Sequence, residues 1–266
     1  MDPRRSTRRE LALLATTLVV VTRPLEGGLA WLTAAFVLAT VVLGALQVLG
    51  QGETRRVPAE CVIVPGVAAL ASVFAIRLVP IGLGLVPAVL LVWLLVDRAL
   101  AVEARLLSRP TTPAPEDRNA LLAVVLLVAF LGFAGAAGAV PGALVEPSDA
   151  STSFSEIGLL TLVLADGVVA GLLGYRLAML ESANVRDALW AALTFGAVAA
   201  IGAAAFRAIA LPRLIGPALL TLLVYLWSAY TRAPRRRLDR RTRLVEAALL
   251  VVAGFLAVGW NLLLRR

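Results

Sequence analysis

The sequence contains no histidine and no lysine, and it has a single cysteine, Cys61. Without histidine the chain lacks the commonest metal ligand and the commonest general base in enzymes. A single cysteine cannot form an internal disulfide or a thiolate cage around a metal ion. These absences argue against haem, zinc and serine–histidine chemistry, so we expect no metal site and no cofactor.

Charge is also scarce, since only 16% of the 266 residues are charged while 60% are hydrophobic. Soluble domains contain about 25% charged and about 45–50% apolar residues. The mean hydropathy is +0.90, far on the apolar side. This composition predicts an all-α, polytopic integral membrane protein embedded in the lipid bilayer. It excludes disordered, collagen-like and disulfide-rich chains.

A membrane-spanning helix needs roughly 20 apolar residues. The first apolar run is short and follows four arginines, as in a secretory signal, but no small-residue cleavage site follows it. We count it as a span, which predicts a single transmembrane domain over residues 1–266 with about nine helices, in the range 8–9. The expected spans are Leu11–Thr22, Leu29–Leu49, Val62–Val79, Ile81–Val96, Ala120–Val140, Ile157–Met179, Ala188–Leu211, Leu214–Tyr230 and Leu244–Leu264.

The arginines predict the orientation of these spans. With the N-terminus inside, 19 of the 25 arginines fall on the inner side and 6 on the outer side. Cytoplasmic loops of membrane proteins carry such an excess, so we expect a cytoplasmic N-terminus and an external C-terminus. The use of arginine without lysine is typical of high-GC bacteria, which indicates a bacterial cytoplasmic (inner) membrane. The same bias explains the net charge of +8, and we expect no nucleic-acid partner.

Two longer connections divide the chain. An inner linker covers residues 97–119, and its charged start predicts either an extension of the preceding span or an amphipathic surface helix. An acidic outer loop covers residues 141–156 and joins the segments 29–140 and 157–264. Similar Arg, Pro and Trp spacings in these segments, including Pro80 and Pro212, predict a parallel internal repeat of four plus four helices after a first extra helix.

Asp166 is the sharpest candidate for an intramembrane functional residue. It lies mid-way along the predicted span Ile157–Met179, where a carboxylate costs about 2.5–3.5 kcal/mol on insertion scales. It is expected either to carry function or to hold two helices together through a hydrogen bond. Nearby glycines, Gly167, Gly171 and Gly174, and a second set, Gly132, Gly135 and Gly138, favour close helix packing, with a glycine-lined pore as the alternative.

Several arginines are candidates for contact with anions. Arg77 and Arg207 each lie near the outer face before a proline, where they are expected to bind a lipid headgroup or a substrate carboxylate, or to snorkel to the interface. A polybasic inner loop is expected to attract anionic lipid. Its members are Arg235, Arg236, Arg237, Arg240 and Arg241.

Three classes of function fit these features. The first is a non-catalytic membrane component, which is structural, assists assembly or interacts with lipid, and which has membrane-protein partners. The second is a transporter of small solutes or lipids with a site near Asp166. The third is a membrane enzyme that acts on a lipid-linked substrate. Because histidine and lysine are missing, the first class is favoured, and no residue is assigned a catalytic role.

Overall fold

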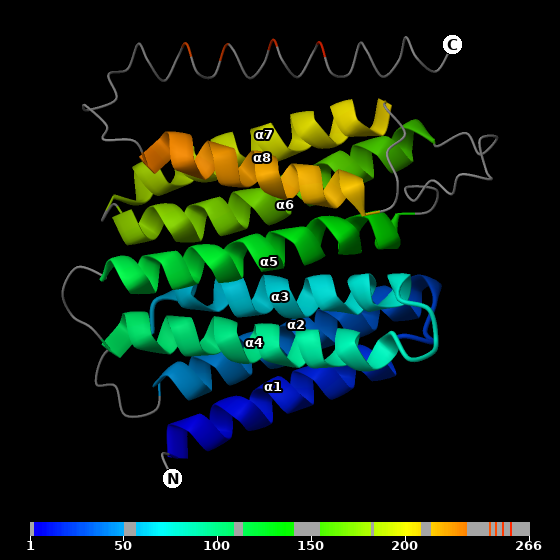
Figure 1. Ribbon diagram of the computed structural model, residues 1–266, viewed down its shortest axis with the longest axis vertical. Helices are drawn as coiled ribbons and strands as arrows, with labels where there is room; N and C mark the ends of the chain where they lie inside the picture. Colours follow the sequence, from blue (N-terminus) through cyan, green and yellow to red (C-terminus); the bar gives the residue numbers. More distant parts are fainter. Residues whose placement is uncertain are drawn as a thin grey trace. The chain divides into compact units, whose positions relative to one another are not determined.

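Every regular element that the structure describes is helical (Figure 1). The computed structural model describes residues 3–50, 57–108, 114–140, 155–181, 184–208 and 214–232, together with four single residues beyond them. The helices are α1 (Pro3–Val21), α2 (Gly27–Gly50), α3 (Ile63–Ala75), α4 (Leu85–Ser108), α5 (Pro115–Ala139), α6 (Glu156–Glu181), α7 (Val185–Ala208) and α8 (Ile215–Arg232). Short 3-10 turns, η1 (Ala59–Val62) and η2 (Ile76–Leu78), flank α3.

Among the residues that the structure describes, six helical segments are long and apolar enough to cross a membrane. They are α2, the continuous segment Ala59–Leu78 around α3, α4, α5, α6 and α7. α1 falls outside this set because its first turns carry arginines, and the apolar part of α8, Ile215–Thr231, is shorter. The chain is therefore a multi-pass membrane protein, as its composition predicts.

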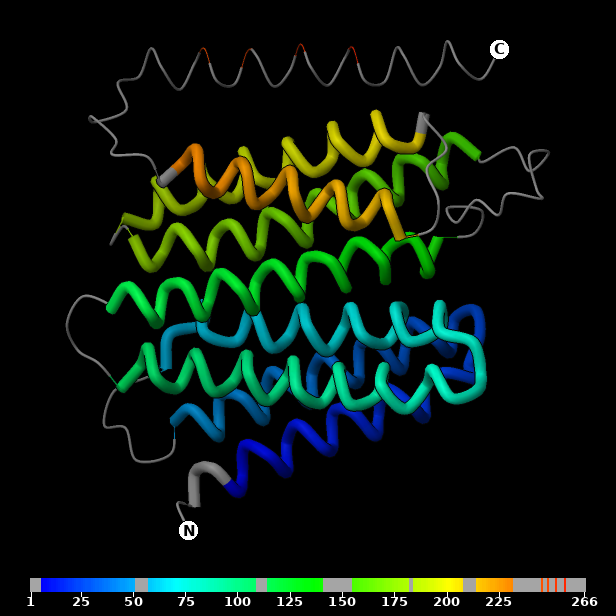
Figure 2. Tube along the Cα trace, in the orientation of Figure 1, coloured from blue at the N-terminus to red at the C-terminus, as the bar shows by residue number. Residues whose placement is uncertain are grey.

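The chain divides into two compact units, Met1–Gly138 and Ala139–Arg266. In unit 1, α3 is the most enclosed span, with 72% of its apolar window buried. Residues 22–26 connect α1 to α2, and residues 79–84 connect α3 to α4 (Figure 2). α3 ends before Pro80 because a proline forces the residue before it out of the helical region, and Val79 is indeed extended.

Unit 2 contains α6, α7 and α8, and its closest packing is between α6 and α7. Both of these helices begin at a side-chain cap. The Ser155 hydroxyl accepts a hydrogen bond from the Gly158 N–H at 3.0 Å, and the Asn184 side chain accepts one from the Arg186 N–H at 3.0 Å. Such caps satisfy backbone donors that the first turn of a helix leaves unpaired.

α4 continues without a break past Val96, the predicted end of the fourth span, to Ser108. The charged residues after Val96 do not stop the helix, since Asp97 and Glu103 point into the protein and are 8% and 0% exposed. The prediction that this stretch extends the span is confirmed. The start of α4 also lies at Leu85 rather than Ile81, because Gly82 adopts a turn with a φ of 155°.

The ninth predicted span, 244–264, lies almost wholly outside the described residues, as does most of the acidic loop 141–156. The count of nine spans and the internal repeat therefore stay predictions. Pro212, which the repeat pairs with Pro80, also lies outside the described residues.

Candidate functional site

Asp166 lies in the middle of α6, ten residues after the first residue of the helix, Glu156. It belongs to a buried stripe in which residues recur every three or four positions, the spacing of one helix face. The stripe consists of Leu162, Asp166, Ala170, Leu173 and Leu177. Asp166 itself is 2% exposed, and its Oδ1 atom is buried without a hydrogen-bond partner among the described residues.

A seam of small residues holds α6 against α7 beside Asp166. A Cβ atom added to Gly167 would lie 3.3 Å from the Gly196 carbonyl oxygen, and one added to Gly171 would lie 3.1 Å from the Ala192 carbonyl oxygen. Gly174 faces the ring of Phe195, whose Cγ atom would be 2.5 Å from an added Cβ. The packing interpretation of these three glycines is confirmed, since a neighbouring helix occupies the space where their side chains would be.

The glycines of α5 make a similar approach inside unit 1. A Cβ atom on Gly135 would lie 2.7 Å from the backbone oxygen of Ala71 in α3. One on Gly138 would lie 2.9 Å from Leu78 Cδ2 and 3.2 Å from the Phe74 oxygen. Unit 1 and unit 2 are thus each held by glycine contacts that no larger residue fits without movement.

Arg77 of η2 binds the α1–α2 connection of unit 1 through backbone carbonyls. Its Nη2 atom donates hydrogen bonds to the Thr22 oxygen at 3.0 Å and the Leu25 oxygen at 2.6 Å. Its Cζ atom lies 5.6 Å from the centre of the Phe74 ring, within cation–π range. In return, Arg23 donates to the Val79 carbonyl. The contacts described for Arg77 are those of a clamp between the α1–α2 and α3–α4 connections.

The other arginine candidates lie at the end of α7 or outside the described residues. Arg207 lies in the last turn of α7 and is partly buried, and residues 209–213 after it are outside the described residues. The polybasic loop formed by Arg235, Arg236, Arg237, Arg240 and Arg241 lies outside them as well. Binding of lipid or anions by these residues stays a prediction.

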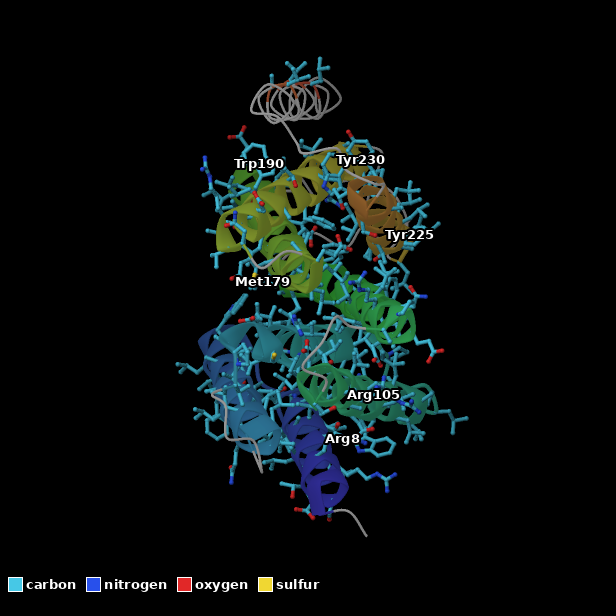
Figure 3. All side chains as sticks on the ribbon, turned by 90° about the vertical axis from the view of Figure 1, so that its left-hand side faces the viewer. Arg8, Arg105, Met179, Trp190, Tyr225 and Tyr230 are labelled. Atoms are coloured by element: carbon cyan, nitrogen blue, oxygen red, sulfur yellow. The ribbon has the colours of Figure 1, made fainter. Side chains whose placement is uncertain are left out.

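The opposite end of unit 1 contains two ion pairs between helices. Arg8 Nε of α1 donates to Asp97 Oδ1 of α4 at 2.8 Å, and both side chains are largely buried. Arg105 Nε of α4 lies 3.5 Å from Asp117 Oδ1 of α5, with the arginine 49% exposed. Figure 3 shows Arg8 and Arg105 at the same end of the unit. This end of unit 1 is formed by the first turns of α1 and α5 and by the second half of α4. We call it the arginine-rich end.

Sequence reasoning missed two buried charges, Glu103 of α4 and Arg176 of α6. Glu103 is fully buried, and Arg176, which falls near the inner end of the predicted span Ile157–Met179, lies inside α6 and is 4% exposed. Asp97 and Glu103 lie six residues apart, about 120° around a helix of 3.6 residues per turn, so their spacing alone does not place them on one buried face.

The described part of the chain contains no group of three or more His, Cys, Asp or Glu residues placed to hold a metal ion. Comparisons of the chain with models of protein families, with curated proteins and with solved structures find no match. The features that bear on function are the buried Asp166 and the bonded arginines at the two ends of unit 1.

Proposed function

We propose that this protein is a non-catalytic, multi-pass component of a bacterial cytoplasmic membrane, with a structural, assembly or lipid-interacting role. The observation that supports this proposal is the set of contacts that charged side chains make within unit 1. Arg8 pairs with Asp97, Arg105 pairs with Asp117, and Arg77 bonds to loop carbonyls. Charged groups that fix helices to each other stabilise a rigid body and are not free to act on a substrate.

Exposed apolar faces give such a component a surface for lipid or for other membrane proteins. On α2, Leu29, Leu32, Phe36 and Leu43 are each at least 60% exposed and recur at helical spacing. On α6, Leu160, Leu164 and Val168 form a second exposed face. In a membrane protein such faces contact either lipid or a helix of a partner protein. Only a partner protein gives a crosslinked product of constant mass.

Photo-crosslinking in native membranes tests this proposal. A photoreactive amino acid replaces Phe36 on α2 or Leu164 on α6, and Val37, which is fully buried, serves as the internal control. We expect a discrete crosslinked protein of constant mass from at least one exposed position and none from position 37. Lipid adducts alone from both exposed positions would contradict the role as a component of an assembly.

The orientation belongs to the same proposal, with the arginine-rich end of unit 1 in the cytoplasm. In support, Arg8, Arg105 and Arg118 lie at that end, whereas Arg23 and Arg77 lie at the other. The C-terminus is then external if the predicted ninth span crosses. Anionic lipid is the partner proposed for the polybasic loop 235–241, on the charge of that segment alone.

Cysteine accessibility provides the measurement of orientation. In a Cys61→Ala background, Glu26→Cys and Glu116→Cys place one exposed thiol at each end of unit 1. In intact cells, we expect an impermeant maleimide to label position 26 and not position 116. Permeabilised cells should label both, which shows that each thiol is reactive. Labelling of position 116 alone would reverse the proposed orientation.

A second candidate function is transport of a small solute or lipid. The observation that favours it is the buried Oδ1 atom of Asp166, which has no hydrogen-bond partner among the described residues. Ionisable residues within spanning helices often mark the routes of ions or substrates. Uptake of substrate by proteoliposomes, lost in Asp166→Asn, would favour transport over a purely structural role.

A further inference from the structure

The surroundings of Asp166 within unit 2 are apolar and closely packed. Its neighbour in sequence, Gly167, faces Gly196 and Ala200 of α7, and Ala170 one turn later is fully buried. The nearest end of α6 is ten residues away, which is about 15 Å along the helix at 1.5 Å per residue. Asp166 is therefore far from both membrane surfaces if α6 spans the bilayer.

Most of the other titratable groups described in unit 2 lie toward the ends of its helices. On α6 these groups are Glu156, Tyr175, Arg176 and Glu181, and on α7 they are Arg186, Asp187 and Arg207. On α8 they are Tyr225, in the middle of the helix, and Tyr230. Arg207 comes seven residues after Ala200, or about 10 Å along α7. No salt bridge to Asp166 occurs among the described residues.

An ionised carboxylate in this position would be a buried charge without a described counter-ion. Burying an unpaired charge costs far more than burying a neutral polar group, so such groups neutralise instead. A buried acidic oxygen with no hydrogen-bond partner also carries a desolvation cost. Uptake of a proton removes the charge and turns the carboxylate into a carboxylic acid that can donate as well as accept.

We propose that Asp166 is a proton-binding site in the middle of α6, holding a neutral carboxylic acid whose proton exchanges with the medium. In the binding step a hydronium ion gives up one of its O–H bonds, the proton forms an O–H bond to one carboxylate oxygen, and water remains. Release reverses both changes, and no electron is transferred. This site goes beyond the role as a membrane component and depends on neither that role nor transport.

Infrared difference spectroscopy on the purified protein in liposomes tests the site directly. The C=O stretch of a neutral carboxylic acid lies apart from the bands of carboxylates and of the amide backbone. At pH 7 we expect this band in the wild type and its loss in Asp166→Asn. Asn has nearly the shape of the neutral acid, so the variant should keep the thermal stability of the wild type. Glu156→Gln is the matched control, because Glu156 is exposed on the same helix and should not contribute to the band.

Exchange is measured by transfer to D₂O, which should lower the frequency of the Asp166 band within minutes. A band that does not shift over a day would show a sealed structural acid and would overturn the site. Absence of the band, with an Asp166 carboxylate signal in its place, would show a paired anion and would also overturn it. Conversion to the carboxylate on addition of Na⁺ at constant pH would identify a cation site instead and refute the assignment to a proton.

None of these outcomes depends on the crosslinking experiment. A discrete crosslinked partner without the carboxylic acid band would support the membrane component and reject the proton site. The reverse pair of results would keep the proton site and reject the component. The two proposals therefore fail separately.

Discussion

Replacing Gly135 by Ala should destabilise the protein by about 1–3 kcal/mol, the usual cost of forcing extra volume into a packed interior. The added Cβ atom would lie 2.7 Å from the backbone oxygen of Ala71. A backbone atom cannot rotate away as the end of a side chain can, so α5 and α3 must separate. Thermal unfolding in detergent, followed by the loss of helical circular dichroism, measures the effect as a lower melting temperature.

The matched control is Gly28→Ala near the start of α2. Nothing lies within 4 Å of a Cβ atom built there, and Gly28 has no positive φ. Because alanine favours the helix over glycine by about 1 kcal/mol, this variant should be neutral or slightly stabilised. The two substitutions are chemically identical but should change stability in opposite directions. Equal melting temperatures for both variants would show that α5 and α3 do not meet as described.

The same test applies to unit 2 with Gly196. An added Cβ atom there would lie 2.9 Å from the Gly167 oxygen, whereas one on Gly216 would meet nothing within 4 Å. The sequence predicts close packing at Gly135 and Gly167 from spacing alone, because glycines three or four residues apart share a helix face. It cannot say which helix meets that face, since any neighbour with a small residue fits equally well.

The sequence predicts the helical, membrane-spanning character of the chain for a simple reason. Long apolar runs without charge have few alternatives to a buried helix, because backbone groups must pair within the segment in lipid. The same rule does not give the length of α4, which continues as a helix past Asp97 to Ser108. Asp97 pairs with Arg8 of α1. That pairing joins residues 89 positions apart, which no local pattern reveals.

The candidate site is also predicted only in part from the sequence. Asp166 itself can be recognised, because a lone acid in a long apolar run is costly wherever the run is buried. The surroundings of that acid are not readable, since only the packed unit shows that Asp166 Oδ1 has no hydrogen-bond partner among the described residues. Arg77 shows the opposite outcome: a residue that the sequence offers for headgroup binding is bonded to the carbonyls of Thr22 and Leu25.

The Arg8–Asp97 pair should show a large coupling free energy in a double-mutant cycle. Arg8→Gln and Asp97→Asn each remove one charge and keep most of the volume. Because the two groups meet at 2.8 Å with side chains only 19% and 11% exposed, either single variant leaves a charged group poorly solvated. We expect a coupling of about 1–3 kcal/mol between them, as for hydrogen bonds between charged groups out of water. The double variant should therefore be less destabilised than the sum of the single variants.

The Arg105–Asp117 pair provides the comparison, with Arg105→Gln and Asp117→Asn. Its atoms are 3.5 Å apart and its arginine is 49% exposed, so water screens the interaction. Exposed ion pairs contribute about 0.2–1 kcal/mol, and salt reduces that further. The coupling should be smaller than in the first cycle and should fall when salt is added, while the Arg8–Asp97 coupling should change little. If both cycles gave the same small, salt-sensitive coupling, Arg8 and Asp97 would be a surface pair, and the continuation of α4 past Val96 would need another cause.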